Sequence, residues 1–375
     1  MPSIEPAAEP AGGVLTIDCG AVAANYRQLR TQLGQARCGA VVKADAYGLG
    51  MGEIAPALAA AGCEDFFVAL IEEGVKLRAL LAQAKIYVFN GADGGGADAL
   101  LEHGLIPALN DPGQIAAYAR AAGATGTSAP AVLNIDTGMT RLGLGPGDIE
   151  ALVAAPERLR GIDVGYVMTH LACASEPDHP LNRDQLSAFA RARRQLKGVC
   201  DAPATLANSA AIFLGPEYHF DLARPGAALY GLVPHPGRPN PMAQVVQLQG
   251  RILQVRDVDS PMTVGYGATH RVRSKGRIAT VSVGYADGYG HGLSNRGSAY
   301  IGDIRVPVVG RVSMDLITLD VSDVPMDRAT PGAFVELIGE HLSLDAVADA
   351  AGTIGYEVLT RLGHRLHRVY VGGAD

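Results

Sequence analysis

One lysine stands where an apolar run ends and an aromatic hydroxyl follows, in Val41-Val42-Lys43-Ala44-Asp45-Ala46-Tyr47-Gly48. The segment from Cys38 has the pattern of a short buried strand, which places Lys43 at its carboxyl end, toward the mouth of a sheet or barrel. A lysine in that place can form a Schiff base with a carbonyl cofactor. Taken alone, a lysine that ends a strand is more often a solvated surface residue, so the interpretation depends on the rest of the chain.

A lysine that carries pyridoxal phosphate needs partners for the phosphate, for the ring nitrogen and for the ring face. Ser209 follows Asn208 at the end of an expected strand, so its hydroxyl and the nearby backbone amides could bind the phosphate. The segment Arg224-Pro225-Gly226-Ala227 offers a second amide pair, because glycine lets a backbone approach closely. Tyr47 and Tyr356 supply phenolic donors.

Arg224 bears on the type of reaction. A guanidinium has a pKa above about 12 and does not give up its proton. An arginine beside the pyridine nitrogen therefore leaves the ring unprotonated and makes it a weaker electron sink. Such a site suits reversible proton exchange at the α-carbon of an amino acid.

Short β-prone runs alternate with amphipathic helical segments between residues 16 and about 231, as in repeated βα units. Eight such units predict a (β/α)8 barrel, although a doubly wound sheet would show a similar alternation. In a barrel, active residues cluster at the carboxyl ends of the strands, where Lys43, His170, Ser209 and Arg224 are expected. The strand-like runs are 40–43, 66–70, 86–90, 106–110, 131–136, 164–170, 205–208 and 221–224.

After residue 234 the chain alternates Val, Ile and Thr with turn residues, which predicts a mostly antiparallel β domain with strands in 245–255, 277–283, 299–309 and 315–321. Helices are expected at 343–351 and near 357–362. The predicted organisation is a disordered leader at 1–13, a barrel at 14–234, a proline-rich connector at about 235–241 and a β domain at 242–375.

The composition argues against several other classes of protein. The chain has 375 residues, 48% of them hydrophobic, and a net charge of -7 with dispersed basic residues, unlike a nucleic-acid binder. No run approaches the roughly 18 to 20 apolar residues of a membrane helix, and no signal peptide is visible, so a cytoplasmic location is expected. The five cysteines are scattered without a Cys-x-x-Cys pair, so neither a disulfide framework nor a metal site is expected.

Eight motifs follow one another along the chain: VKADAYG at 42–48, DTGMTRLG at 136–143, MTHLA at 168–172, NSA at 208–210, RPG at 224–226, GYG at 265–267, GYADG at 284–288 and GRVSMD at 310–315. With these motifs the chain resembles the bacterial alanine racemases, the (β/α)8-barrel class (fold type III) of pyridoxal phosphate enzymes, over nearly its whole length. An ordered set of this size is very specific.

The resemblance implies interconversion of L-alanine and D-alanine by two bases on opposite faces of the substrate. Lys43 would act on the D-alanine side and Tyr266 on the L-alanine side, with His170 and Arg224 behind the tyrosine. A free tyrosine has a pKa near 10, so nearby positive charge must lower it. The residues expected at the cofactor are Lys43, Tyr47, His170, Ser209, Arg224, Gly226, Ala227 and Tyr356.

The resemblance also assigns the substrate site. Arg141 would bind the substrate carboxylate, helped by the backbone amide of Met314, while Tyr285 and Tyr356 would narrow the entrance and select a methyl side chain. In this family the β domain of one subunit covers the barrel mouth of the other, which implies a homodimer with shared active sites. The product D-alanine would supply peptidoglycan synthesis.

The chain departs from the family pattern at Leu49, where histidine is more common, and at Asn134. Many members carry a lysine at the second position, and its carbamylated form presents an anion to the substrate-binding arginine. Asparagine cannot be carbamylated. We therefore expect a small anion such as chloride between Asn134 and Arg141.

Three alternatives compete. A broader-specificity amino-acid racemase is the nearest, but its members are typically exported. A decarboxylase on the same fold would not need Tyr266 and normally places an acid, not Arg224, at the pyridine nitrogen. The single-domain pyridoxal phosphate carrier proteins share the barrel but lack the domain after residue 234.

Overall fold

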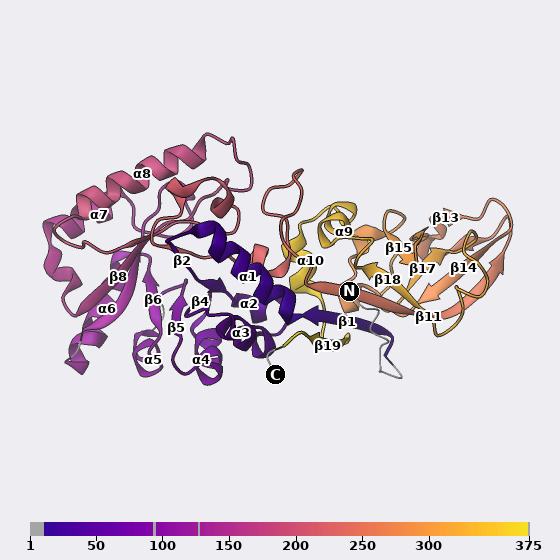
Figure 1. The fold of residues 1–375 in the computed structure, drawn as a ribbon, viewed down its shortest axis with the longest axis horizontal. Coiled ribbons are helices and arrows are strands. Elements are labelled where there is room, and N and C mark those ends of the chain that lie inside the picture. The colour runs from indigo at the N-terminus through magenta and orange to yellow at the C-terminus, as the bar shows by residue number, and fades with distance from the viewer. Residues whose placement is uncertain (1–10, 93–94, 127, 374–375) are drawn as a thin grey trace.

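The computed structural model describes residues 11–92, 95–126 and 128–373. Residues 1–10 of the expected leader lie outside this range, and Gly13, its last residue, opens strand β1 (Gly13–Asp18). Two lobes lie side by side along the long axis of the molecule, a barrel with its helices and a second lobe built mainly of strands (Figure 1).

The N-terminal lobe contains a ring of parallel strands. Their order is β2-β10-β9-β8-β7-β6-β5-β4-β3. Because β2 and β3 are separated only by Gly39, while β2 pairs with β10 and β3 pairs with β4, the sheet closes on itself. The strands are β2 (Arg37–Cys38), β3 (Ala40–Val41), β4 (Asp65–Val68), β5 (Lys85–Val88), β6 (Ile106–Leu109), β7 (Ala129–Asn134), β8 (Ile162–Met168), β9 (Ala204–Thr205) and β10 (Leu222–Ala223).

Helices surround the ring (Figure 1). Asp18 begins α1 by accepting a hydrogen bond from the Ala21 N–H at 2.8 Å, and Asp111 begins α6 in the same way. In α8 the buried residues Gln185, Phe189 and Leu196 recur at helical spacing, so one face of the helix packs on the barrel. The helices are α1 (Cys19–Leu33), α3 (Met51–Ala60), α4 (Ile71–Leu80), α5 (Ala97–Glu102), α6 (Pro112–Thr125), α7 (Pro146–Ala154) and α8 (Leu181–Leu196).

The second lobe is organised around the long strand β11 (Val246–Val258), which pairs antiparallel with β1, β14 and β18. The other strands are β12 (Thr263–Val264), β13 (His270–Arg271), β14 (Gly276–Val281), β15 (Ser298–Ile301), β16 (Ile304–Pro307), β17 (Ile317–Asp320), β18 (Phe334–Ile338) and β19 (His367–Val371). The predicted fold class, an N-terminal barrel and a mostly antiparallel β domain, is confirmed.

Strand β1 differs from its expected place. The sequence assigns residues from 14 onward to the barrel, yet β1 lies in the second sheet, antiparallel to β11 and parallel to β19. Pairing with strands more than 200 residues away is decided by tertiary contacts and leaves no local pattern. The N-terminal strand therefore anchors the start of α1 to the β domain.

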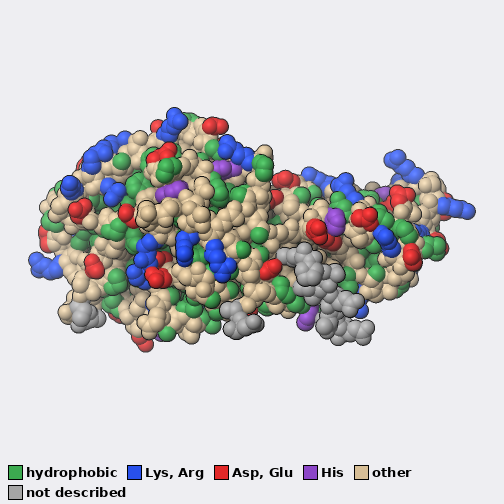
Figure 2. Space-filling view, viewed as in Figure 1, with side chains coloured by type: hydrophobic (Ala, Val, Ile, Leu, Met, Phe, Trp, Pro, Cys, Tyr) green, Lys and Arg blue, Asp and Glu red, His purple; other side chains and the backbone are tan. Residues whose placement is uncertain are grey.

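Two helices close the C-terminal lobe, α9 (Leu344–Ala351) and α10 (Gly355–Arg361), and α10 packs against the short helix α2 (Lys43–Tyr47) of the barrel. Leu359 and Leu15 belong to the same buried cluster as Val41 and Tyr47, so the two lobes share one core. Acidic and basic side chains are interspersed on the face shown in Figure 2. Among residues 11–92, 95–126 and 128–373, no helix is long and apolar enough to cross a membrane.

Candidate active site

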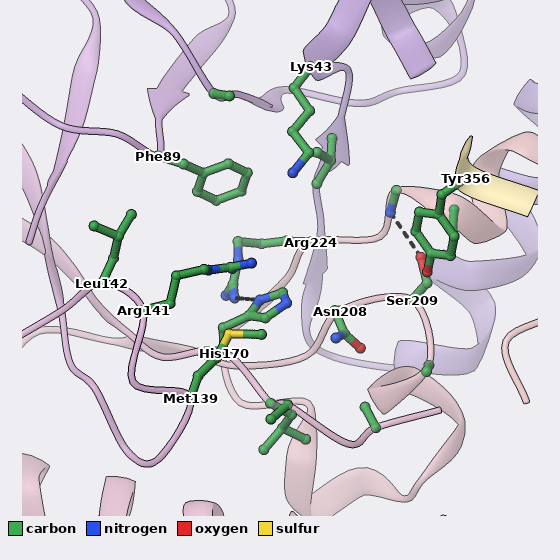
Figure 3. A pocket seen from close by; sticks show the side chains of 18 of the residues that line it. Lys43, Phe89, Met139, Arg141, Leu142, His170, Asn208, Ser209, Arg224 and Tyr356 are labelled. Carbon is green, nitrogen blue, oxygen red and sulfur yellow. Dashed lines mark hydrogen bonds between the residues drawn. The ribbon is translucent and has the colours of Figure 1, made fainter. Parts of the chain in front are cut away.

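A cavity of about 820 Å³ opens at the carboxyl ends of the barrel strands. Figure 3 shows several of its side chains pointing toward one another from different segments of the chain. Its lining includes ten of the residues expected from the sequence, namely Lys43, Tyr47, Asn134, Arg141, His170, Ser209, Arg224, Gly226, Ala227 and Tyr356. This placement agrees with the general rule for barrels of this kind, in which the site lies at the carboxyl ends of the strands.

Lys43 was expected to end a strand. In the structure it instead begins α2, two residues after β3. The four residues that follow it adopt a left-handed conformation, with φ of 53° at Ala44, 54° at Asp45, 54° at Ala46 and 58° at Tyr47. Each L-residue in such a turn costs roughly 1–2 kcal/mol, so the fold must compensate. None of these four residues is a glycine, so the sequence gives no local indication of the turn.

Hydrogen bonds hold the left-handed turn at its far end. The Gly48 N–H donates to the Ala44 carbonyl at 2.7 Å, and the Gly50 N–H donates to the Asp45 carbonyl at 2.9 Å. The Asp45 carboxylate accepts the Met51 N–H at 2.8 Å, which joins the turn to α3. These bonds hold the turn that follows Lys43 and join it to the start of α3.

The Lys43 amine lies over the ring of Phe89, 5.9 Å from its centroid, as Figure 3 shows from the side. Burial is the main cause that lowers the pKa of Lys43, and the positive charge of Arg141 lowers it further, while Glu73 opposes both. A lower pKa increases the neutral fraction of the amine. Only the neutral amine can attack a carbonyl or accept a proton.

Ser209 lies at the end of the cavity where a phosphate is expected. Its Oγ accepts the N–H groups of Gly226 at 2.9 Å and of Ala228 at 3.1 Å, so its own hydroxyl hydrogen remains to donate. A Cβ at Gly226 would come within 3.0 Å of Tyr47 Cζ and 3.3 Å of Val41 Cβ. Glycine therefore leaves the opening beside Tyr47 that a side chain would fill.

Arg224 is almost fully buried and donates from one Nη to Thr205 Oγ1 and from the other to the Thr169 carbonyl at 2.8 Å. Its Nε has no hydrogen-bond partner in the part of the chain that the structure describes. Burial lowers the pKa of Arg224 to about 9. Because this value is still above neutral pH, the guanidinium remains protonated. A buried guanidinium in this cavity suits a polar ring atom of a ligand.

His170 lies within 3.5 Å of Arg224, from its Nδ1 to the guanidinium (Figure 3). Burial lowers the pKa of His170 to about 3, and the positive charges of Arg224, Arg141 and Lys43 contribute in that order. The imidazole is therefore neutral and can accept a hydrogen bond from Arg224. Together, the lysine, the serine hydroxyl, the open glycine and the buried arginine fit the expected pyridoxal phosphate.

Arg141 extends from a loop shaped by Asp136, whose Oδ1 accepts the N–H groups of Gly138, Met139 and Thr140 at 2.9 to 3.1 Å. The Arg141 side chain is exposed, and it forms no ion pair or hydrogen bond within the described ranges. Its guanidinium is therefore available to a carboxylate of the substrate.

Asn134 ends β7, is buried, and donates from Nδ2 to Asn110 Oδ1 at 2.7 Å. Asn110 in turn donates to the Phe89 carbonyl at 3.0 Å and to the Ala108 carbonyl at 2.9 Å. Because both amide hydrogens of Asn110 point at carbonyls, its oxygen must face Asn134, which fixes the orientation of both amides. Asn134 keeps one N–H and its carbonyl for a ligand. Asn110 was not among the residues expected at the site, although a polar residue directly after β6 was a signal for it.

Three expected site residues lie away from this cavity, on the β domain. Tyr266 is 73% exposed, Met314 53% and Tyr285 45%. They share one region, because the Tyr285 N–H donates to the Ser313 carbonyl at 3.0 Å and the glycine before Tyr266 borders the backbone of Arg311. The three side chains therefore lie together on an exposed surface of the β domain, outside the lining of the cavity that holds Lys43.

Comparisons with known proteins agree with this geometry. Residues 17–234 match the sequence model described as "Alanine racemase, N-terminal domain", and residues 245–370 match "Alanine racemase, C-terminal domain". An alanine racemase of Rhodospirillum rubrum is 53% identical over 364 residues and covers 96% of each chain. One of Rhizobium meliloti is 46% identical over 371 residues, 96% of this chain and 97% of its own.

Solved structures give the same result. The alanine racemase of Bartonella henselae "with covalently bound pyridoxal phosphate" superposes with a TM-score of 0.93 at 40% identity and covers 96% of this chain and 100% of its own. A biosynthetic alanine racemase of Pseudomonas aeruginosa superposes with a TM-score of 0.89 at 35% identity and covers 96% and 99%. Since both domains match and the likeness extends over nearly the whole length, the chain belongs to the alanine racemase family.

Proposed function

We propose that this pyridoxal phosphate-dependent racemase interconverts L-alanine and D-alanine with Lys43 and Tyr266 as its two bases. The observation that carries the assignment of Lys43 is its position, with a lowered pKa, in one cavity with the buried guanidinium of Arg224. When bound, the cofactor withdraws electrons from the α-carbon of the substrate and makes its proton acidic.

Different residues of the chain would bind different parts of the cofactor. Lys43 would hold its carbonyl carbon, and Arg224 would donate to its ring nitrogen. The Ser209 hydroxyl, the backbone of 226–227 and the phenols of Tyr47 and Tyr356 would hold its phosphate. The Tyr47 ring is held in place for this role by its neighbours, since its centroid lies 4.6 Å from that of Tyr230 and 6.1 Å from that of Tyr356.

Racemisation needs a base on each face, because a single base returns the proton mostly to the side from which it came. The lowered pKa of Lys43 lets its neutral amine accept the α-proton on the D-alanine side. Tyr266 would act on the L-alanine side. The guanidinium of Arg224 and the neutral imidazole of His170, 3.5 Å apart, would lie behind that phenol.

Selectivity for alanine is assigned to four residues. Arg141 would bind the carboxylate together with the backbone amide of Met314, while Tyr285 and Tyr356 would leave room for a methyl group only. The relatives compared above are named alanine racemases, so nothing in these comparisons supports the broader-specificity alternative.

The exposed positions of Tyr266, Tyr285 and Met314 support a homodimer in which these residues complete the cavity of the partner.

We place the enzyme in the cytoplasm, where D-alanine would supply peptidoglycan synthesis. A strain without this gene should then need external D-alanine to grow, and growth without it would contradict the assigned role.

The purified enzyme should convert either enantiomer to a mixture with an equilibrium constant near unity. Borohydride should abolish both its visible absorbance and its activity, because reduction makes the bond between lysine and cofactor permanent. Peptide mapping should then find the cofactor on Lys43. Label on another lysine, such as Lys76 or Lys85, would overturn the assignment.

For Asn134, we expect an anion between its remaining N–H and the guanidinium of Arg141, because the arginine has no partner in the described residues. A bromide-soaked crystal should show an anomalous peak between the two side chains, and activity should depend on halide. A water-filled site with halide-independent activity contradicts the proposal.

A further inference from the structure

We propose that Glu73, which nothing in the family assignment singles out, is a positioning residue for Lys43; this deepens the proposed function and rests on it. Glu73 is the third residue of α4 and contacts the turn that follows the lysine. Its Oε1 accepts the Ala44 N–H at 2.6 Å. Its Oε2 accepts the N–H groups of Ala69 at 2.8 Å and of Leu70 at 3.1 Å.

The Ala44 N–H needs this acceptor. Ala44 is the first of the four left-handed residues, and the N–H groups at the start of a helical turn have no partner within the turn. The bonds from Gly48 and Gly50 close the far end of the turn, while the strand before it is held by the Val42 N–H donating to the Phe67 carbonyl at 2.9 Å. Glu73 thus holds the backbone on the Lys43 side of the turn.

Only a carboxylate satisfies all three donors. Its two oxygens accept without donating, so one serves Ala44 while the other serves the loop between β4 and α4. A glutamine has one oxygen and an NH₂ group, and the latter would face an N–H on one side. Glu73→Gln therefore has to release either the Ala44 N–H or the start of α4.

The charge of Glu73 acts in addition to its geometry. It favours the protonated form of Lys43, against burial and the charge of Arg141. Removing the charge should likewise disfavour protonation of the Lys43 nitrogen when it is bonded to the cofactor. The pH at which the visible absorbance of the bound cofactor changes should then move to lower pH.

A purely structural reading is that Glu73 only begins α4. The neighbouring Glu72 separates the two readings, because it lies in the same first turn, carries the same charge and is exposed, yet forms no hydrogen bond in the described part of the chain. Glu72→Gln is therefore the matched control for the effect of charge on the helix.

The test compares wild type, Glu73→Gln, Glu73→Ala and Glu72→Gln as holoenzymes. We expect Glu73→Gln to lower kcat by about 10- to 100-fold in both directions, since a small misplacement of a reacting group has effects of that size. The absorbance midpoint should fall to lower pH, and hydrogen exchange in a peptide covering 43–50 should become faster. Glu72→Gln should match wild type in all three measurements.

A Glu73→Gln enzyme with a lower Tm but unchanged kcat, absorbance midpoint and exchange at 43–50 would show a helix-start role only and overturn the proposal. If Glu73→Ala does not fold, Glu73→Gln decides. Failure of the proposed function is distinguishable, because it appears in the wild type as absent racemisation or as label away from Lys43.

Discussion

Tyr266→Phe is expected to slow removal of the α-proton from L-alanine by about 10²- to 10⁴-fold, the usual contribution of a general base, and to affect D-alanine far less. The phenol is the base on one face only, while Lys43 remains on the other. The substitution cannot change the equilibrium constant, so the rates of net racemisation in the two directions change together. The asymmetry is therefore measured as the rate at which solvent deuterium enters the α-position, starting from each enantiomer.

A matched control removes a phenol elsewhere in the same domain. Tyr300 stacks on His341 with ring centroids 5.0 Å apart, and Tyr300→Phe should exchange deuterium at the wild-type rate from both enantiomers. Equal and small effects of Tyr266→Phe in the two directions would rule out the two-base assignment. The exposure of Tyr266 in the isolated chain makes this result informative, because the tyrosine has to reach a cavity that it does not line.

Lys43→Ala and Tyr266→Ala, each inactive alone, should regain activity when they are mixed and allowed to exchange subunits. The heterodimer holds one intact site, built from Lys43 of one chain and Tyr266 of the other. Random reassortment places about half of the dimers in that state, so about one quarter of the wild-type sites return. The rate of alanine racemisation before and after exchange measures the effect.

The control for this experiment mixes Lys43→Ala with a chain that carries both substitutions. No heterodimer of that pair contains Lys43, so no activity should return. Mass spectrometry verifies that subunits have exchanged. If exchange is complete and the first mixture stays inactive, each site lies within one chain and the shared architecture is wrong.

Local patterns in the sequence were sufficient for the architecture. Period-2 and helical-period runs are direct consequences of which side chains face a core, and a strand overlaps each predicted run, although β18 and β19 were not predicted. The same patterns place Lys43, His170 and Arg224 near strand ends, and a closed barrel brings all such ends to one cavity. The fold and most of the cavity residues therefore follow from the sequence.

The tertiary structure alone decided what depends on distant or locally unfavourable contacts. Strand β1 pairs with β11 and β19, which lie more than 200 residues away. The left-handed turn after Lys43 is costly for L-residues, and it persists because Gly48 and Gly50 close its far end while Glu73, 29 residues away, accepts the Ala44 N–H. Local propensity describes the chain a few residues at a time, whereas these features gain their stability from partners that only the folded chain brings within reach.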